Sequence, residues 1–445
     1  MNIPFPQGIT GIDAIPKAKE YLLNIFITKD GAVRTPGVDG FSTGSGACRG
    51  AVTWRDGSAY MVSGQSLIRV NRNGSVDDLG TIKGDADCVF SEGQVNLVVI
   101  VKGGKGYYYN SFNGLTEITD PDFIPSVSVD FIDGRHVFIP FDGEPAFYSG
   151  VDDPASIGAL SFFDAEELPD KNRAVINIKN QLHILGDKSI EIFRTNIDPD
   201  VVFTRRQGAR IDIGYIGGLV RFGEGFAFLG RKRDQSYRFY VVSGGQYSPI
   251  STTAIDEILN KYTAEKLEAC DALRFEWLGY EALVFKLDEH TFYFINGLWG
   301  YVSSELNNSP KGRWRAKGIC HAYGSYIVGD ETTRDIGKLA DVPTEYGNDV
   351  EFEVQTFIRD KKNSFLDIRR IELNCLTGQK DESISLAVSS DGFTYGDFVS
   401  RRLGSIGDYQ KQVAWQPIGT FENFCGLRLR STADVKFGLE AIEAL

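Results

Sequence analysis

The sequence has few of the residues on which most metal and nucleophilic sites depend. It holds four histidines, His136, His183, His290 and His321, and none of them belongs to an HExxH motif or another ligand spacing. Neither a GxSxG turn nor a papain-like cysteine context occurs. We therefore expect no catalytic residue, no metal ligand, no cofactor-binding residue and no cofactor. His183 and His321 lie within apolar strand runs, where we expect core or turn histidines.

Disulfide and targeting signals are also missing. The six cysteines are scattered without a CxxC pair, at Cys48, Cys88, Cys270, Cys320, Cys375 and Cys425. This spacing predicts reduced thiols in a cytosol rather than a disulfide framework. The first residues, 1–13, have no basic region followed by an apolar stretch, and no run reaches about 18 consecutive apolar residues. We expect neither export by a signal peptide nor insertion into a membrane.

Basic charge is in deficit, with 47 Lys and Arg against 60 Asp and Glu and a formal net charge of −13. A chain with this balance does not match the phosphate backbone of nucleic acids, so stable nucleic-acid binding is disfavoured. The short basic runs at 231–233 and 401–402 are typical of solvated loops. Hydrophobic residues make up 42% of the chain, as in ordinary soluble proteins, and the length of 445 residues suggests two or three domains.

The abundant residues favour strands and tight turns. The chain contains 30 Phe, 19 Tyr and 49 Gly but only 2 Met. Between residues 50 and 347, an apolar run, a tight turn and a second apolar run recur as seven hairpins. These hairpins begin at Ala51, Cys88, Ser128, Ala174, Leu219, Arg274 and Gly318. Because four-stranded blades take roughly 40 to 50 residues each, this repeat predicts a degenerate six- or seven-bladed β-propeller.

One segment, residues 253–269, departs from the strand pattern. It places four apolar residues at the spacing of an amphipathic helix, Ile255, Ile258, Leu259 and Tyr262. Thr253 with Asp256 resembles a capping box, and Thr263 is placed to cap a second short turn. We predict a helical insertion that packs on the outside of a blade or between two blades.

The two ends of the chain lack the hairpin repeat found in the middle. After Asn348, alternating strands follow one another without the hairpin repeat, and six or more strands over 348–445 suit a β-sandwich. Residues 1–49 carry PFPQG, RTPGV and FSTGSGACRG, which predict an irregular arm that leads into the first blade and lies against a neighbouring subunit. The expected all-β chain thus divides into an arm (1–49), a propeller (50–347) and a sandwich (348–445).

Two glycine-rich pieces were candidates for a phosphate-binding loop. Gly44–Gly50 and Lys102–Gly106 lack the Walker spacing and are followed by strands rather than helices. Turns explain both pieces better. The segment Ser389–Gly396 approaches the Asp-box of sialidases, but Gly392 follows Asp391 directly and Tyr395 stands where tryptophan belongs, so an Asp-Gly hairpin turn is the simpler interpretation.

Three acidic pairs were candidates for glycoside hydrolysis: Asp152 with Asp153, Glu166 with Glu167, and Asp120 with Asp122. Such enzymes need two carboxylates that converge about 5 to 9 Å apart. Because adjacent residues on a strand point to opposite faces, a pair that is local in sequence does not provide this geometry. We expect all three pairs in surface loops.

The stretch Gly244–Phe285 resembles the tail accessory proteins of short-tailed bacteriophages, a family also described as packaged-DNA stabilisation proteins. Shared features are a G-Q-x-S-P-I turn, a short helix, a Y-T-A-E step and an L-R-F hairpin start, here Gly245, Gln246, Ser248, Pro249 and Ile250, then Ile255, then 262–265 and 273–275. Weaker similarities follow in order along the chain at 35–38, 167–170, 189–193 and 389–396. The resemblance touches most of the chain, but only the central stretch is distinctive.

This resemblance implies a non-enzymatic structural subunit of the tail nozzle. It implies a homo-hexameric ring that extends the channel of the portal and its adaptor (head-to-tail connector) protein, retains packaged DNA and lets it pass on ejection. It also implies attachment of tail fibres or a tailspike and of a needle or plug, no membrane insertion, and location in the virion tail after assembly in the host bacterial cytoplasm. Because duplex DNA carries one charge per roughly 1.7 Å, we expect net acidic loops in the lumen, which genomic DNA passes without specific binding.

Two other functions fit a propeller of this kind. A propeller-type glycan-binding or glycan-degrading protein acting on host surface polysaccharide would need an axial pocket with converging carboxylates and exposed aromatic rings. A cellular propeller that scaffolds partners would need neither. Release of sugar from host lipopolysaccharide would favour the glycan function, whereas six-fold assembly with portal or adaptor proteins would favour the nozzle.

Overall fold

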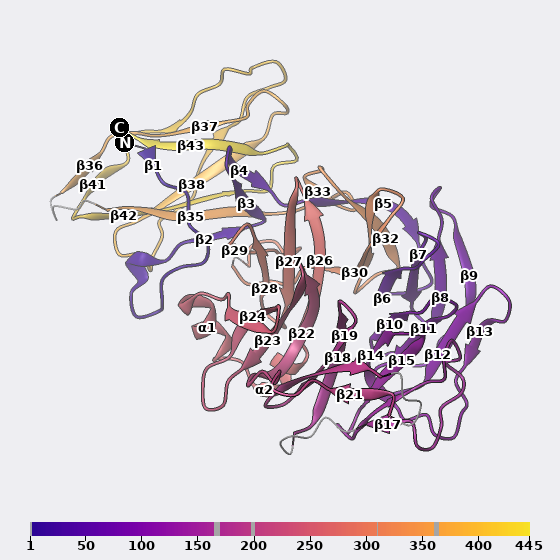
Figure 1. Ribbon diagram of the computed structural model, residues 1–445. Coiled ribbons are helices and arrows are strands. Elements are labelled where there is room, and N and C mark those ends of the chain that lie inside the picture. Colours follow the sequence, from indigo (N-terminus) through magenta and orange to yellow (C-terminus); the bar gives the residue numbers. More distant parts are fainter. Residues whose placement is uncertain (1, 164–169, 197–200, 309, 360–364) are drawn as a thin grey trace.

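The fold is a seven-bladed β-propeller with a β-sandwich beside it and two short α-helices (Figure 1). It is seen in a computed structural model that describes residues 2–163, 170–196, 201–308, 310–359 and 365–445, and the elements counted here belong to those residues. The propeller fills the lower right of Figure 1 and the sandwich the upper left. The all-β class and the propeller-plus-sandwich architecture predicted from the sequence are confirmed, and the number of blades is seven.

Each blade is a four-stranded antiparallel sheet whose strands, with one exception in the last blade, follow one another in chain order. Blade 1 consists of β6 (Cys48–Thr53), β7 (Ala59–Ser63), β8 (Ser66–Val70) and β9 (Val76–Thr81), and blade 2 of β10 (Cys88–Glu92), β11 (Leu97–Val101), β12 (Gly106–Asn110) and β13 (Gly114–Glu117). Blade 3 consists of β14 (Ser126–Ile132), β15 (Arg135–Pro140), β16 (Ala146–Tyr148) and β17 (Phe162–Phe163), and blade 4 of β18 (Asn172–Ile178), β19 (Gln181–Gly186), β20 (Ile190–Thr195) and β21 (Phe203–Arg205). Blade 5 consists of β22 (Gly214–Phe222), β23 (Gly225–Arg231), β24 (Arg238–Ser243) and β25 (Gln246–Pro249), and blade 6 of β26 (Asp271–Trp277), β27 (Tyr280–Lys286), β28 (Thr291–Ile295) and β29 (Leu298–Tyr301). Blade 7 consists of β30 (Ala316–Ala322), β31 (Ser325–Asp330) and β32 (Asp335–Ala340), and its fourth strand is β5 (Gly37–Thr43) from the start of the chain.

Each of the seven predicted hairpins forms the first two strands of one blade. The turn between β14 and β15 shows why the local sequence suffices: Asp133 and Gly134 have φ values of 45° and 83°, the geometry of a type I′ turn, which Asp-Gly favours. The register places Ile132 opposite Arg135 on either side of this two-residue turn. Turn chemistry therefore sets the pairing of the two strands.

The second strand of a blade is apolar throughout because neighbouring blades cover both of its faces. All of β11 is buried. Val99 and Val101 pack toward blade 1, whereas Val98 and Ile100 pack toward blade 3. Since successive side chains of a strand point to opposite faces, one five-residue strand joins two neighbouring cores.

The first strands of the blades form a closed ring around the axis. β6, β10, β14, β18, β22, β26 and β30 contact one another in this order, and β30 contacts β6. The blades approach so closely that a Cβ on Gly50 would lie 2.5 Å from the carbonyl oxygen of Cys88, and one on Gly318 would lie 2.8 Å from Sγ of Cys48. Cys48 and Cys88 are the first residues of their strands, and Cys270 precedes β26 directly. Half of the scattered cysteines therefore mark the starts of blades.

The predicted helical insertion is confirmed as two short helices, α1 (Thr253–Leu259) and α2 (Ala264–Glu268). The cap of α1 lies one residue earlier than predicted, because Thr252 has the extended backbone of a cap and its Oγ1 accepts a hydrogen bond from the N–H of Ile255. Thr263 stands at the N-cap of α2, as predicted.

The helices pack between blades 5 and 6. Ile255 and Leu259 of α1 are fully buried in one cluster with Phe239 of blade 5 and Phe285 of blade 6. The rings of Phe239 and Phe285 are stacked with centroids 4.2 Å apart. The second of the two predicted locations, between two blades, is therefore the one observed.

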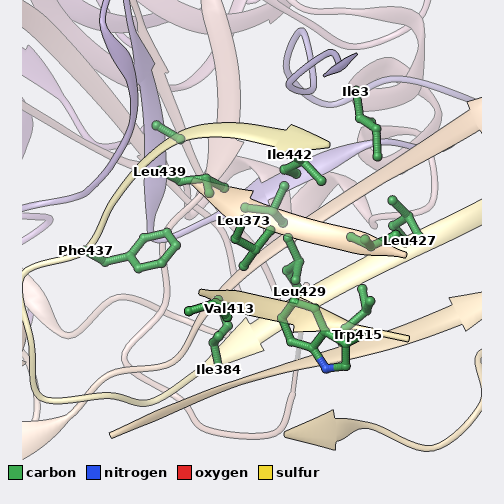
Figure 2. Packing of buried hydrophobic residues seen from close by; sticks show 14 of the residues in the cluster. Ile3, Leu373, Ile384, Val413, Trp415, Leu427, Leu429, Phe437, Leu439 and Ile442 are labelled. Carbon is green, nitrogen blue, oxygen red and sulfur yellow. The ribbon is translucent and has the colours of Figure 1, made fainter. Parts of the chain in front are cut away.

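The C-terminal sandwich is completed by strands from the start of the chain. Its own strands are β35 (Phe352–Arg359), β36 (Leu366–Ile368), β37 (Ile371–Cys375), β38 (Ser383–Ser389), β39 (Val399–Arg402), β40 (Val413–Trp415), β41 (Gly419–Phe421), β42 (Phe424–Ser431) and β43 (Gly438–Ala444). The N-terminal strands are β1 (Asn2–Ile3), β2 (Tyr21–Leu23), β3 (Ile25–Thr28) and β4 (Gly31–Arg34). β1 and β4 both pair with β43. Figure 2 shows Ile3 of β1 close to Ile442 of β43 in the apolar core of the sandwich.

The expectation that residues 1–49 form an irregular arm is therefore wrong, because this range contains strands that belong to both domains. Five complete strands and the start of a sixth lie in this range, and β5 supplies the outer strand of blade 7, with Val38 opposite Leu339 of β32. Of the motifs that suggested irregular structure, RTPGV and FSTGSGACRG lie partly within β4, β5 and β6, and PFPQG lies in the connection between β1 and β2. β3 and β4 form a local hairpin, but β1, β2, β4 and β5 also pair with strands some 300 or more residues along the sequence, and no local pattern reveals that pairing.

Strand β2 joins the propeller to the sandwich. It lies parallel to β29 of blade 6, with Leu23 opposite Tyr301, and antiparallel to β35, with Tyr21 opposite Gln355. One nine-stranded sheet thus runs from blade 6 through β2 into the sandwich. The hydroxyl of Tyr21 donates to the buried carboxylate of Glu353, which also lies 3.2 Å from Nε of Arg428.

We predict that Leu22→Ala destabilises the sandwich, whose core contains Leu22. Leu22 in β2 is fully buried, and a leucine-to-alanine change in a core costs about 2 to 5 kcal/mol. Equilibrium urea denaturation followed by circular dichroism measures the loss. Ile15→Ala is the matched control, because Ile15 lies in the same N-terminal segment but is 53% exposed, and it should change the free energy of unfolding by less than about 0.5 kcal/mol. Equal effects of the two variants would contradict the contribution of β2 to the sandwich core.

Candidate functional site

A cavity of about 1030 Å³ runs along the propeller axis and is lined by the first strands of all seven blades. Because the first strands of a propeller run in the same direction, residues near the strand starts form one mouth and residues near the strand ends the other. We call these the start mouth and the end mouth. The acidic and basic residues of the lining are Arg49, Asp87, Lys102, Arg173, Asp271 and Lys317 at the start mouth, and Glu92, Asp130, Arg221, Arg274 and His321 at the end mouth.

The lining between the two mouths is mostly apolar. Each first strand contributes an apolar residue to it, in blade order Ala51, Val89, Val129, Val175, Leu219, Ala272 and Ile319, and Ser128 adds a hydroxyl that donates to the carbonyl of Val175. This apolar belt separates the charges of the two mouths. The cavity therefore has polar ends and an apolar waist.

An ion pair crosses the start mouth. Lys317 of blade 7 donates to Asp87 beside blade 2 at 2.6 Å, and so passes over blade 1. Burial alone would lower the pKa of Lys317, but the carboxylates of Asp271 and Asp87 outweigh it and raise that pKa. Burial likewise opposes ionisation of Asp87, yet Lys317 and Lys102 hold its pKa below the ordinary value. The pair stays charged and ties together blades that are not neighbours.

A second ion pair crosses the end mouth. Arg221 of blade 5 donates to Asp130 of blade 3 at 2.7 Å and to the carbonyl of Asn177 in blade 4 between them. The carboxylate of Asp130 also accepts the backbone N–H groups of Phe131 and Asn177. Burial nevertheless raises the pKa of Asp130. This pair braces the far end of the ring as Lys317 and Asp87 brace the near end.

The end mouth also contains Glu92, which is exposed to the cavity. Its pKa is raised, first by burial among the blades and then by the neighbouring charge of Asp130, while Arg221 opposes the shift. Glu92 and Asp130 are the carboxylates that hydrolysis of a glycan at this mouth would need. Asp130 is held by Arg221, however, so one of the two is already engaged.

The four histidines occupy four different environments. His136 and His183 are buried, as expected for His183, whereas His321 is exposed at the end mouth next to the turn between β30 and β31, so of the two expected placements the turn applies. His290 lies 2.6 Å from the hydroxyl of Tyr262. Burial lowers the pKa of His136 to about 3 and that of His290 to about 4. Among the residues that the structure describes, no three His, Cys, Asp or Glu side chains gather into a metal-binding group.

The acidic pairs singled out in the sequence cap turns. Asp120 accepts the N–H groups of Asp122 and Ile157 at 2.9 and 3.0 Å, and Asp153, next to Asp152, accepts that of Ala155 at 3.1 Å. Both pairs lie in loops, as predicted. Glu166 and Glu167 lie outside the described residues.

The Asp-box-like segment is also a turn. The carboxylate of Asp391 accepts the N–H groups of Phe393 and Thr394 at 2.7 and 2.8 Å, and these bonds lower its pKa. The glycine-rich piece Gly44–Gly50 leads into β6, and Lys102–Gly106 forms the turn between β11 and β12. The turn interpretation of these three segments is confirmed.

The sequence did not reveal which charged residues meet at the start mouth. Arg49, Asp87, Lys102 and Lys317 come from blades 1, 2 and 7. A signal for them exists in retrospect, because Arg49, Asp87 and Lys317 each stand within one residue of the start of a first strand. Charge at the same position of successive hairpins is therefore the pattern that marks an axial mouth.

A second cavity of about 710 Å³ lies between the helices, the N-terminal segment and a loop of the sandwich. Its lysines are matched by carboxylates: Lys261 pairs with Asp13, and Lys266 pairs with Asp288 at 2.5 Å. The side chain of Phe393 at its rim is 69% exposed. This cavity marks the joint between propeller and sandwich.

Comparisons with known proteins match both domains. A family model described as "Bacteriophage P22 Gp10, beta-propeller" matches residues 13–342, and one described as "Bacteriophage P22 Gp10, beta-sandwich" matches residues 351–445. The tail hub protein gp10 of Salmonella phage P22 is 23% identical over 288 residues, which cover 60% of this chain and 59% of that protein. The chain thus aligns with less than two thirds of this relative.

Solved structures give only distant likenesses. PorZ of the Porphyromonas gingivalis type-IX secretion system is 12% identical with a TM-score of 0.40, over 76% of this chain and 44% of that one. An exo-beta-1,3-galactanase of Phanerochaete chrysosporium is 9% identical with a TM-score of 0.30, over 82% and 97%. Likenesses at this level do not bear on function.

We predict that Lys317→Met destabilises the propeller by about 1 to 3 kcal/mol, because it leaves Asp87 without its partner. The side chain of Lys317 is only 12% exposed. The matched control is Lys436→Met, which removes a surface pair with Asp341 whose side chains are 60% and 68% exposed, and which should cost at most about 1 kcal/mol. Urea midpoints at pH 7 measure both changes, and a larger loss in the control would refute the brace.

We predict that stability falls as the pH drops from 7 to 5, in part because of His136. Its pKa is about 3 in the fold against 6.5 ordinarily, so only the unfolded state takes up a proton in this range. The folded state then loses about 1.4 kcal/mol for each pH unit below 6.5, or about 2 kcal/mol at pH 5.

The variant His136→Asn tests this because it lacks the titrating group. Its unfolding free energy should change less between pH 7 and pH 5 than that of the unmodified chain, by about 2 kcal/mol. His321→Asn is the control, since it removes an exposed histidine instead of a buried one. An identical slope in all three proteins would show that His136 is protonated in the fold.

Proposed function

The chain belongs to the family of bacteriophage P22 Gp10, and on this basis we propose that it is a structural subunit of a phage tail. The family models cover both the propeller and the sandwich. The resemblance to phage tail accessory proteins, carried in the sequence by residues 244–285, is thereby confirmed. Membership in this family favours a structural role over an enzymatic one.

The finer proposal is a tail-nozzle subunit. Six copies form a ring that extends the channel of the portal and adaptor proteins, retains packaged DNA, passes it on ejection and anchors fibres or a tailspike and a needle or plug. The observation that supports this most is the nine-stranded sheet. Because β2 pairs with β29 of blade 6 at Leu23 on one side and with β35 of the sandwich on the other, a load on one domain reaches the other through backbone pairing. A wall around pressurised DNA needs that stiffness.

The charge of the chain agrees with the proposed passage of DNA. A formal net charge of −13 leaves loops of the ring free to present carboxylates to the lumen, where they repel the phosphate backbone and let it slide. The net acidic lumen remains a prediction for the assembled ring. It is distinct from the axial cavity of each propeller, whose start mouth is rich in basic side chains.

We predict that the purified chain assembles with its adaptor ring into a complex of six copies. Native mass spectrometry gives the number of copies, and negative-stain imaging shows whether the complex prolongs the channel. A chain that stays monomeric and ignores the adaptor would contradict the nozzle proposal.

The glycan alternative is tested on the same preparation. Incubation with host lipopolysaccharide should release no reducing sugar. If sugar is released, Glu92→Gln decides whether the end mouth is responsible, because Glu92 is the carboxylate there without a cation bound to it among the described residues. Release that disappears in this variant would replace the structural role with an enzymatic one.

A further inference from the structure

The net charge of the chain hides two regions of the propeller with opposite charge. From β12 to β17, residues 106–163, the sequence has nine Asp or Glu and a single Lys or Arg, Arg135. Blades 4 and 5, residues 172–249, have twelve Lys or Arg and seven Asp or Glu. An acidic region and a basic region therefore follow one another around the propeller.

The acidic region also presents apolar side chains to solvent. Phe141, at the turn between β15 and β16, is 67% exposed, and Ile124, in the connection between β13 and β14, is 40% exposed. The N–H of Phe141 donates to the carbonyl of Pro125 at 2.9 Å, which ties this turn to the segment that carries Ile124. The ring of Phe141 rests on blade 2, because a Cβ on Gly103 would lie 2.9 Å from its Cδ2. Exposed apolar side chains that are held in place in this way are typical of protein–protein contacts.

Three exposed carboxylates accompany these apolar residues. Asp142 and Glu144 lie in the same turn as Phe141, and Asp122 lies two residues before Ile124. Oδ1 of Asp142 accepts the N–H of Glu144 at 3.3 Å, but no Lys or Arg of the described chain forms an ion pair with any of the three carboxylates. We call Asp122, Ile124, Phe141, Asp142 and Glu144 the acidic surface. A partner that covers it has to bring both apolar contact and positive charge.

Positive charge of this kind is present in the basic run that begins at Arg231, between β23 and β24 of blade 5. Aromatic rings hold two of its cations: the guanidinium of Arg231 lies 5.2 Å from the ring centroid of Tyr237, and the ammonium of Lys232 lies 4.7 Å from that of Tyr247. Arg233, whose side chain is 94% exposed, has its one ion pair among the described residues with the next residue in the chain, at 3.8 Å. Rings fix a cation without neutralising it, so the charge stays available to a partner. We call Arg231, Lys232 and Arg233 the basic turn.

The acidic surface and the basic turn do not meet within one chain. Both are built on connections at the face of the start mouth. Blade 4 lies between blades 3 and 5, and no ion pair joins the two surfaces within the described residues. Because they lie at the same level along the propeller axis, a contact between the two surfaces on different copies can repeat around a ring without a shift along that axis.

We propose that the acidic surface of one copy of the chain binds the basic turn of a second copy. This names a contact between subunits of the proposed ring, and it rests on the proposed function in one respect, that copies of the chain associate. Ion pairs between the two surfaces set the orientation, while the rings of Tyr237 and Tyr247 provide apolar area for Phe141 and Ile124. The basic turn alone would also suit the phosphate backbone of DNA, but the acidic surface would not. A second copy is the partner that fits both surfaces.

The test reverses the charge of each surface and then restores complementarity between copies. One variant carries Asp142→Lys and Glu144→Lys, and the other carries Arg231→Glu and Arg233→Glu. Sedimentation velocity of the full chain over a range of concentrations measures association. Each variant alone brings like charges together and should associate at least about tenfold more weakly than the unmodified chain. In an equimolar mixture the reversed surfaces match each other, and association should return to within about threefold of the unmodified chain.

The matched control carries Asp30→Lys and Glu422→Lys, which change the net charge as much as the first variant does. Both residues are exposed, in the turns between β3 and β4 and between β41 and β42, and this variant should associate as the unmodified chain does. Circular dichroism melts establish that each variant is folded. A rise in potassium chloride from about 50 to about 500 mM should weaken association of the unmodified chain, because salt screens exposed charges, and this measurement keeps the test decisive if a reversed variant does not fold.

The outcomes separate this contact from the proposed function. Six copies that assemble on the adaptor with the folded reversed variants as well as with the unmodified chain would overturn the contact and leave the nozzle intact, whereas a chain that stays monomeric with and without the adaptor would overturn both. Loss of association that the mixture does not recover would show that the two surfaces do not meet each other. Binding of duplex DNA that Arg231→Glu with Arg233→Glu abolishes, without any change in self-association, would assign the basic turn to DNA instead.

Discussion

Backbone pairing between the first 43 residues and the last third of the chain is the constraint on which the structure depends. β5 completes blade 7, β2 fills the gap between blade 6 and the sandwich, and β1 and β4 flank β43. Each of these strands satisfies N–H and C=O groups that would otherwise remain unpaired at the edge of a sheet. The propeller closes, the sandwich gains its full set of strands, and the two domains become one body through the same short segment. Buried polar contacts such as that between Tyr21 and Glu353 then fix its register.

Charge at the axis adds a second level of closure. In a ring of seven blades, contacts between neighbours alone would allow the ring to open at any single blade interface. The pairs Lys317 with Asp87 and Arg221 with Asp130 each span a blade and lie at opposite mouths. Their partial burial keeps the interaction strong, since it is screened less than a surface pair. The apolar belt between them excludes charge from the waist, so the axial cavity combines structural bracing with two chemically distinct ends.

The sequence predicts the fold where the pairing is local and fails where it is distant. All seven first hairpins and both helices are readable because turn residues such as Asp133 and Gly134, or apolar residues such as Ile255 and Leu259, lie within a few positions of one another. The N-terminal strands are missed because they are two to seven residues long and β1, β2, β4 and β5 pair with strands hundreds of residues away. The same limit hid the pairing of Lys317 with Asp87, which stand 230 residues apart in the sequence.

Pairing of β1 and β4 with β43 also fixes the timing of folding during synthesis. A ribosome produces the N-terminal strands first, yet residues 438–444, to which β1 and β4 attach, emerge some 400 residues later. Until then these strands have no edge to join, and the nascent chain carries open sheets whose exposed backbone invites wrong partners or chaperones. A product truncated before β43 cannot complete its sandwich, so closure of the fold serves as a check that translation has reached the end of that strand.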